Sequence, residues 1–145
     1  MGKNSREYPT RPLIGVGAVI IQDSKIVLVR RSKPPARGEW SIPGGLVKVG
    51  ETLTQAVVRE ALEETGLRIK TGPMIDLVER ILHDGNSRIQ YHYVIADYRC
   101  SAIGGVFQAG SDASEAQWVP RDQLGDFRLP AIALSVINKA FKLGG

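Results

Sequence analysis

One segment near the middle of the chain carries a strong helical pattern between two groups of strand-like segments. Over residues 52–66, apolar residues recur every three or four positions, which is the spacing of one helix face. Thr52 or Thr54 can cap the start of this helix, and Gly66 stands where a helix ends. An amphipathic helix must cover another element, so we expect the neighbouring strands to form a sheet against it.

Runs rich in Val, Ile and Tyr predict strands before and after this helix, and a second helix closes the chain. The strands are expected at residues 15–21, 25–31, 40–43, 74–82, 88–99 and 117–119, and the closing helix at residues 129–143, with Pro130 in its first turn. This order indicates an α/β or α+β domain with a mixed β-sheet and helices on its faces.

The length of 145 residues is typical of one domain, and the chain contains no internal repeat. We expect residues 1–12 to form an N-terminal arm and residues 13–145 to form a single domain. The single Cys excludes an internal disulfide and a zinc site built from several cysteines.

The N-terminal residues and the apolar segments predict a cytoplasmic protein that does not bind membranes. Residues 1–12 are polar, and the longest apolar run, Ile14–Ile21, is far shorter than the about 20 residues of a membrane-spanning helix. The net charge of +4 favours anionic partners. The basic residues of segment 30–37 lack the aromatic residues of a nucleic-acid-binding module, so we expect a small-molecule nucleotide and no nucleic acid.

Two common nucleotide-binding motifs are incomplete in this chain. Gly15 and Gly17 begin like a dinucleotide fingerprint, but Ile20 occupies the position of the third glycine, and the segment is a strand. Gly45 and Gly50 have the spacing of a phosphate-binding P-loop, but the next residue is Glu51 instead of Lys. Neither motif therefore accounts for nucleotide binding.

The helix at residues 52–66 carries three glutamates on one face, Glu60, Glu63 and Glu64. Several carboxylates close together are what a hard divalent cation prefers. A solvated acidic helix face is the alternative for this triplet taken alone.

The residues around the three glutamates resemble the Nudix box, and the resemblance extends over most of residues 12–143. Five residues separate Gly45 from Glu51, and seven separate Glu51 from Arg59. The nine specified positions that match are Gly45, Glu51, Arg59, Glu60, Ala61, Glu63, Glu64, Gly66 and Leu67. The resemblance implies a Nudix-type α/β/α sandwich and a metal-dependent hydrolase of a nucleoside diphosphate linked to another group.

The family resemblance also implies roles for individual residues. Glu60, Glu63 and Glu64 match the ligands of Mg²⁺ or Mn²⁺, with the Gly45 carbonyl as a further ligand. Arg59 and Glu51 are expected to orient these ligands, or to form a local ion pair without a catalytic part.

Three further groups of residues remain open between alternatives. The general base is a glutamate of the box or an acidic residue on a later loop, where Asp112 and Glu115 lie. Strand alternation allows only one of Arg30 and Arg31 to face substrate phosphate. The aromatic candidates for stacking on a base are Tyr8, Trp40, Tyr91, Tyr93, Trp118 and Phe127.

The resemblance is to short ADP-ribose pyrophosphatase-like members, which implies hydrolysis of an ADP-ribose-like substrate to AMP and a sugar phosphate. One alternative is cleavage of a nucleoside triphosphate to the monophosphate and pyrophosphate, as in cleaning of the nucleotide pool. Another alternative is a module that binds ADP-ribose-type ligands without cleaving them. A homodimer is also expected from the family, with residues 1–12 available for exchange between subunits.

Overall fold

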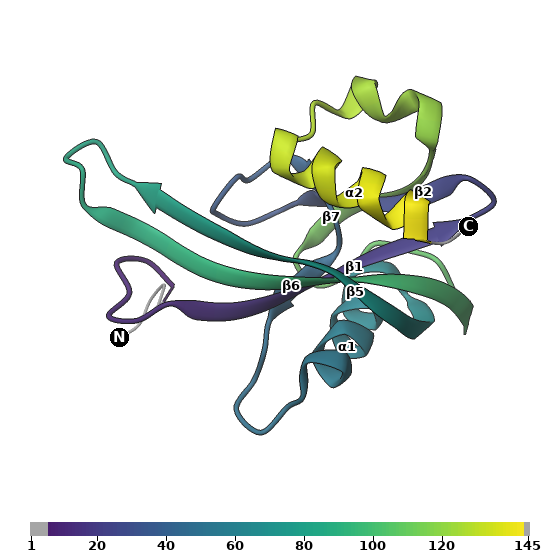
Figure 1. Ribbon diagram of the computed structural model, residues 1–145, viewed down its shortest axis with the longest axis horizontal. Coiled ribbons are helices and arrows are strands. Elements are labelled where there is room, and N and C mark those ends of the chain that lie inside the picture. Colours follow the sequence, from purple (N-terminus) through teal and green to yellow (C-terminus); the bar gives the residue numbers. More distant parts are fainter. Residues whose placement is uncertain (1–5, 144–145) are drawn as a thin grey trace.

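A seven-stranded mixed sheet runs through the computed structural model, which describes residues 6–143 (Figure 1). The strands are β1 (Leu13–Gln22), β2 (Lys25–Arg31), β3 (Trp40–Ser41), β4 (Gly44–Leu46), β5 (Leu67–His83), β6 (Ile89–Gly105) and β7 (Ala113–Pro120). The helices are α1 (Leu53–Thr65), the short 3-10 helix η1 (Arg121–Phe127) and α2 (Ala131–Leu143).

The strand order is β3-β2-β1-β6-β5, with β4 paired to β1 and β7 paired to β2. β1 and β6 run parallel, and the other neighbouring strands run antiparallel. The predicted mixed sheet is therefore confirmed.

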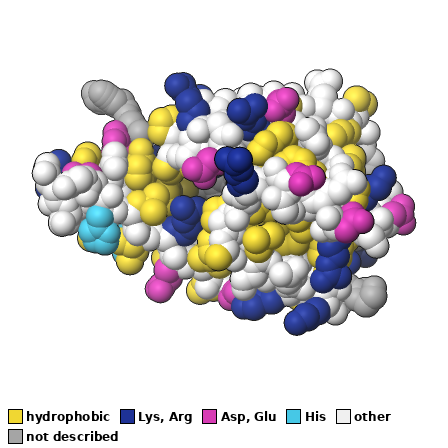
Figure 2. Space-filling model, turned by 90° about the horizontal axis from the view of Figure 1, so that it is seen from above, with side chains coloured by type: hydrophobic (Ala, Val, Ile, Leu, Met, Phe, Trp, Pro, Cys, Tyr) yellow, Lys and Arg dark blue, Asp and Glu magenta, His cyan; other side chains and the backbone are white. Residues whose placement is uncertain are grey.

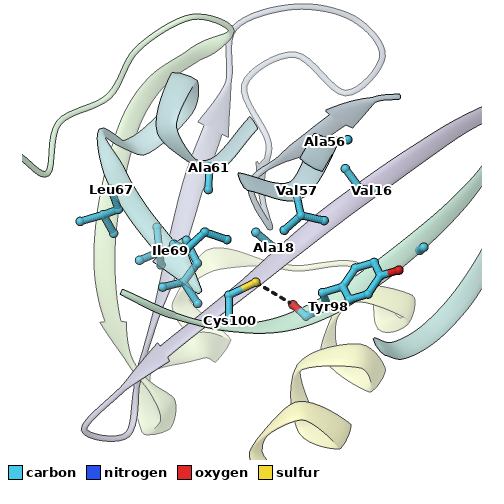
Figure 3. Close-up of a cluster of buried hydrophobic side chains, with 12 residues drawn as sticks. Val16, Ala18, Ala56, Val57, Ala61, Leu67, Ile69, Tyr98 and Cys100 are labelled. Atoms are coloured by element: carbon cyan, nitrogen blue, oxygen red, sulfur yellow. Dashed lines mark hydrogen bonds between the residues drawn. The ribbon is translucent and has the colours of Figure 1, made fainter. Parts of the chain in front are cut away.

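Helices α1 and α2 cover opposite faces of the sheet, as Figure 1 shows. Side chains alternate along β1, so Val16, Ala18 and Ile20 pack in one core cluster with α1 (Figure 3). Val19 and Ile21 point the other way and pack in a second cluster with α2. The predicted sandwich of helices around a sheet is confirmed, and each helix has its own core.

The hairpin of β5 and β6 is longer than the predicted strands at residues 74–82 and 88–99. β5 begins at Leu67, directly after α1, because Leu67 and Ile69 are buried while Arg68 and Lys70 are exposed. The pairing shifts register between Thr71 and Met74, where Gly72 and Pro73 interrupt the pattern that sequence analysis relied on.

Two short strands were also predicted with the wrong limits. The strand predicted at residues 40–43 ends at Ser41 as β3, and Gly44 and Gly45 pair with Gly17 and Val16 as part of β4, which was not predicted. The strand predicted at residues 117–119 extends over Ala113–Pro120 because it pairs along the whole of β2.

The two ends of the described chain pack against the sheet. Helix α2 begins one residue after Pro130, where the prediction placed Pro130 inside the first turn. In the described part of the expected arm, the Tyr8 hydroxyl donates to Asp84 at 2.7 Å and the Tyr8 N–H donates to the Gln90 carbonyl at 2.8 Å. Residues 1–5 lie outside the described residues, so exchange of the arm stays a prediction. Within the described range, neither helix has the length and apolar character needed to cross a bilayer.

Candidate active site around helix α1

Well-formed ends hold helix α1 and its glutamates in place. The Thr52 hydroxyl accepts a hydrogen bond from the Gln55 N–H at 3.1 Å, and the Gln55 side chain accepts one from the Thr52 N–H at 2.9 Å. Gly66 ends the helix with φ +75°, and its N–H donates to the Leu62 carbonyl. A side chain at Gly66 would overlap the Val106 carbonyl, so only glycine fits this end.

Arg59 ties the helix to the loop before it. Its guanidinium donates to both Glu51 carboxylate oxygens, at 2.7 and 3.0 Å, and to the Leu46 carbonyl at 3.0 Å. The same group donates to Glu60 at 2.8 Å and to Glu63 at 3.2 Å. The two hydrogen bonds from Arg59 to Glu51 form a bidentate contact. They lower the pKa of Glu51 to about 2, so the Glu51 carboxyl is ionised at neutral pH.

Glu64 is the most buried of the three helix glutamates. It is 6% exposed and accepts a hydrogen bond from the Gly44 N–H at 3.2 Å. Burial raises the pKa of its carboxyl to about 8, and the nearby Glu60 and Asp112 act in the same direction. Burial also raises the pKa of Glu60, against the influence of Arg59.

Gly45 lies directly against Glu60. A Cβ added at Gly45 would overlap the Glu60 carboxyl group. The absence of a side chain at position 45 therefore lets the Glu60 carboxylate lie against the β4 backbone.

The donor set around α1 fits a hard divalent cation in its chemistry. Among residues 6–143, no group of three or more acidic, His or Cys side chains is close enough to hold a metal ion as the side chains stand. The Arg59 guanidinium donates hydrogen bonds to Glu60 and Glu63, and the Gly44 N–H donates one to Glu64. Burial disfavours negative charge on Glu60 and Glu64, and a cation between these carboxylates would offset that cost.

The structure separates the two later acidic candidates. Asp112 precedes β7, pairs with Lys33 at 3.2 Å and lies near enough to raise the pKa of both Glu60 and Glu64. Glu115 was predicted on a loop, and this was wrong. It lies within β7 opposite Arg30, because β7 begins at Ala113, and the two side chains form an ion pair at 3.3 Å.

Arg30 and Arg31 have different surroundings, and the pairing of β2 with β7 shifts register between them, so simple alternation does not place their side chains. The Arg30 side chain is 48% exposed and bonds Glu115 and the Gly38 carbonyl. Arg31 lines a cavity beside Gly44 and Gly45, and its charge lowers the pKa of Glu64. Arg31 is therefore the arginine of the pair that faces the candidate site.

The cavity lies between the sheet and α2 and has a volume of about 180 Å³. Figure 2 views the molecule from the α2 side, where basic, acidic and hydrophobic side chains surround a hollow. Of the six aromatic candidates, Trp40 and Tyr93 line this cavity. Trp118 packs on Phe107, Tyr91 stacks on Tyr93, Phe127 contacts Trp40 edge-on, and Tyr8 bonds Asp84.

Sequence analysis missed Asp97, which also lines the cavity. Asp97 is 6% exposed, and burial raises the pKa of its carboxyl to about 7. One signal was available: Asp97 interrupts an apolar stretch of a strand and has the same parity as Tyr93 and Ile95.

Comparison with known proteins places the chain in a family. The NUDIX domain model matches residues 11–139. An ADP-ribose pyrophosphatase from Methanocaldococcus jannaschii is 35% identical over 113 residues, which are 78% of this chain and 64% of that protein. The chain thus matches just under two thirds of the length of that relative.

Two solved structures are similar over most of the chain. The MutT NUDIX hydrolase from Burkholderia pseudomallei has a TM-score of 0.77 at 27% identity, covering 89% of this chain and 98% of that one. The NUDIX domain of Shewanella oneidensis NrtR, complexed with ADP ribose, has a TM-score of 0.75 at 25% identity, covering 94% and 90% of the two chains. The chain, matched by the family model from residue 11 to residue 139, belongs to the Nudix hydrolase family.

Proposed function

We propose that the protein is a metal-dependent pyrophosphohydrolase that cleaves an ADP-ribose-like substrate to AMP and a sugar phosphate. The observation that carries this proposal is the contact between the α1 carboxylates and the cavity wall. Gly44 and Gly45 line the cavity, while Gly44 donates to Glu64 and Gly45 lies against Glu60. A nucleotide in the cavity can thus extend its phosphates toward the glutamates.

Glu60, Glu63, Glu64 and the Gly45 carbonyl would hold Mg²⁺, or Mn²⁺ in its place. Such an ion neutralises pyrophosphate charge and lowers the pKa of a coordinated water. Arg59 positions Glu60 and Glu63 through the hydrogen bonds described above, and Glu51 in turn orients Arg59.

Arg31 and an acidic side chain complete the proposed chemistry. Arg31 binds a substrate phosphate at the mouth of the cavity, as its position beside Gly44 favours. Water adds across the P–O–P linkage: its oxygen bonds to one phosphorus, the bridging P–O bond breaks, and a carboxylate takes the water proton. Asp112 or Glu64 is favoured as this base over Glu115, because Asp112 lies near enough to Glu60 and Glu64 to raise the pKa of both carboxyl groups.

Product analysis by chromatography tests this proposal. The protein is incubated with Mg²⁺ and ADP-ribose, and separately with each common nucleoside triphosphate and with 8-oxo-dGTP. AMP and ribose 5-phosphate from ADP-ribose are the expected products, and EDTA should abolish them. The same reaction with Glu64→Gln should give little product, and Glu79→Gln, which alters an exposed glutamate on β5, should give as much as the unaltered protein.

Other outcomes would replace the proposal. A monophosphate and pyrophosphate from a triphosphate would indicate cleaning of the nucleotide pool. ADP-ribose binding without turnover in Mg²⁺ or Mn²⁺ would indicate a binding module.

A homodimer is part of the proposal because the family resemblance favours it. The chain has a mass of 15.8 kDa, so light scattering should report about twice that mass. A monomeric mass across the concentration range of the assay would contradict it.

A further inference from the structure

Two glycines hollow out the α2 face of the sheet next to the candidate site. Along β1, Gly15 and Gly17 occupy positions whose parity matches Val19, which packs toward α2. Because these positions carry no side chains, the cavity reaches down to the backbone of β1. The incomplete glycine motif of the sequence thus shapes a cavity instead of binding a pyrophosphate at a helix.

Asp97 forms part of the cavity wall directly beside Gly17. The two residues are partners in the parallel pairing of β1 and β6, and a Cβ at Gly17 would overlap the Asp97 carboxyl oxygen. Among residues 6–143, no group donates a hydrogen bond to this carboxyl, although Asp97 is over nine-tenths buried. A buried carboxyl without a donor is costly, so a native protein keeps one mainly for a role.

Tyr93 gives a second, independent indication on the same wall. Its hydroxyl is buried and has no hydrogen-bond partner within residues 6–143, and the residue is 9% exposed. Tyr93 lies four residues before Asp97 on β6, which is roughly 13 Å along a strand. Within the part of the chain that the structure describes, two residues that line the cavity, Asp97 and Tyr93, thus carry polar groups without a protein partner.

The spacing between Asp97 and the α1 glutamates suits a nucleotide. Gly17 pairs with Asp97 on one side and with Gly44 on the other, so Asp97 is two strand spacings, about 10 Å, from the residue that bonds Glu64. A nucleotide with its phosphates at Gly44 and Gly45 can place its base at Asp97. Trp40 and Val78 supply apolar surface for the faces of a ring.

We propose that Asp97 selects the substrate by accepting a hydrogen bond from the exocyclic amino group of a purine bound in this cavity. The inference rests on the proposed function, because it assigns the base of the same substrate. The shared chemistry is an amino-substituted purine edge, which both adenine and guanine nucleotides carry. The ribose or phosphates can meet Tyr93 and Arg31, which do not discriminate between bases.

Binding of nucleoside monophosphates tests the inference without any turnover. Isothermal titration calorimetry compares AMP with purine riboside 5′-monophosphate, and GMP with IMP, since each pair differs in one amino group. We expect the amino-bearing ligand of one pair to bind about 10- to 100-fold more tightly. The pair that shows this preference distinguishes an adenine from a guanine substrate.

Variants of Asp97 attribute the preference to its carboxyl oxygen. Asp97→Leu keeps a similar shape and removes the acceptor, so the preference should fall to about one. Asp97→Asn keeps a carbonyl oxygen and should retain part of the preference. Asp126→Ala, an exposed carboxylate outside the cavity lining, should keep the full preference.

The outcomes separate this inference from the proposed function. Equal affinities within both pairs for the unaltered protein, or an unchanged preference in Asp97→Leu, would overturn the role of Asp97 while ADP-ribose hydrolysis stands. An Asp97-dependent preference in a protein that hydrolyses nothing would support the inference and remove the proposed enzyme activity.

Discussion

The two faces of the sheet differ in whether the chain supplies hydrogen-bond donors to their carboxyl groups. On the α1 face, each of the three glutamates has a hydrogen-bond partner in the chain: Arg59 serves Glu60 and Glu63, and the Gly44 N–H serves Glu64. On the α2 face, Asp97 has no donor among the described residues, and the hydroxyl of Tyr93 has no partner.

This difference indicates which geometry the chain supplies and which it leaves to a ligand. Hydrogen-bonded networks hold their members in place, so the α1 side chains are ordered before anything binds. The α2 cavity is lined by polar groups that lack partners among the described residues, and such groups are available for recognition. In the two proposals above, reaction chemistry is thus assigned to the α1 face and substrate choice to the α2 face.

The largest expected effect follows from removing charge on the α1 face. Glu64→Gln should lower kcat about 100-fold or more, because a neutral amide is a poor ligand for Mg²⁺ and cannot accept a proton. Initial rates of product formation at saturating Mg²⁺ measure this effect, with a thermal unfolding scan as the check on folding. Near-normal turnover with a normal thermal transition would place the site elsewhere.

The next prediction concerns how the stability of the folded protein depends on pH through Asp97 on the α2 face. Its carboxyl has a pKa of about 7 in the folded protein against an ordinary 3.8, so the folded state holds a proton that the unfolded state releases between these values. Stability from this proton is complete below pH 4 and is lost as pH rises through 7, by up to about 4 kcal/mol. The other charged or titratable side chains that shape this region are Asp76, Arg6, Arg31, Glu39, Arg80 and Tyr93.

Urea denaturation of the unaltered protein and Asp97→Asn at pH 5 and pH 8 measures this contribution. The free energy of unfolding of Asp97→Asn, compared with that of the unaltered protein at the same pH, should be larger at pH 8 than at pH 5. The comparison cancels the change from Glu64, which is common to both proteins and titrates in an overlapping range. A pH-independent difference between the two proteins would contradict a raised pKa at Asp97.

The same substitution on the two faces should change different kinetic constants. Gly45→Ala displaces Glu60 and should lower kcat about 10- to 100-fold, since small misplacements of reacting groups are costly. Gly17→Ala displaces Asp97 and should mainly raise KM. Steady-state kinetics on both variants measures kcat and KM separately. A fall in kcat with unchanged KM for Gly17→Ala would contradict separate roles for the two faces.

A smaller effect is expected from Arg59→Lys. A lysine keeps the charge but cannot make the bidentate contact with Glu51 while also reaching Glu60. We expect about a tenfold loss of kcat and a higher Mg²⁺ requirement, measured by titrating Mg²⁺. The preference for amino-bearing purines should stay unchanged. That result would indicate that the loss of kcat arises on the α1 face.

Local patterns predicted the helix and its surroundings well. Thr52, Gly66 and the apolar spacing between them act within a few residues, so the limits of α1 could be predicted from neighbours in the chain. The prediction placed Glu115 on a loop because the pairing of β7 with β2 joins residues 85 positions apart, as in the ion pair of Arg30 and Glu115. Long-range strand pairing leaves little trace in a short window of sequence.

The choice between Arg30 and Arg31 shows the same limit. Alternation alone would place Arg31 with Val27, which packs on the α1 side of the sheet. The register shift between Arg30 and Arg31 interrupts this pattern, and only the packed sheet shows that Arg31 borders the cavity. Asp97 is a further example, since its polarity in an apolar strand was visible while its parallel pairing with Gly17 was not.

The sequence by itself determined helices α1 and α2, the main strands before and after α1, the placement of three glutamates on one helix face, and the motif that marks the family. These properties depend on spacing along the chain, which the helix and strand periods translate directly into faces. Only the tertiary structure decided that Glu64 accepts from the Gly44 N–H, that Arg31 borders the cavity, and that Asp97 lies in it without a donor from residues 6–143. Burial and hydrogen-bond partners depend on segments distant in the chain, so they arise when the sheet and its two helices pack together.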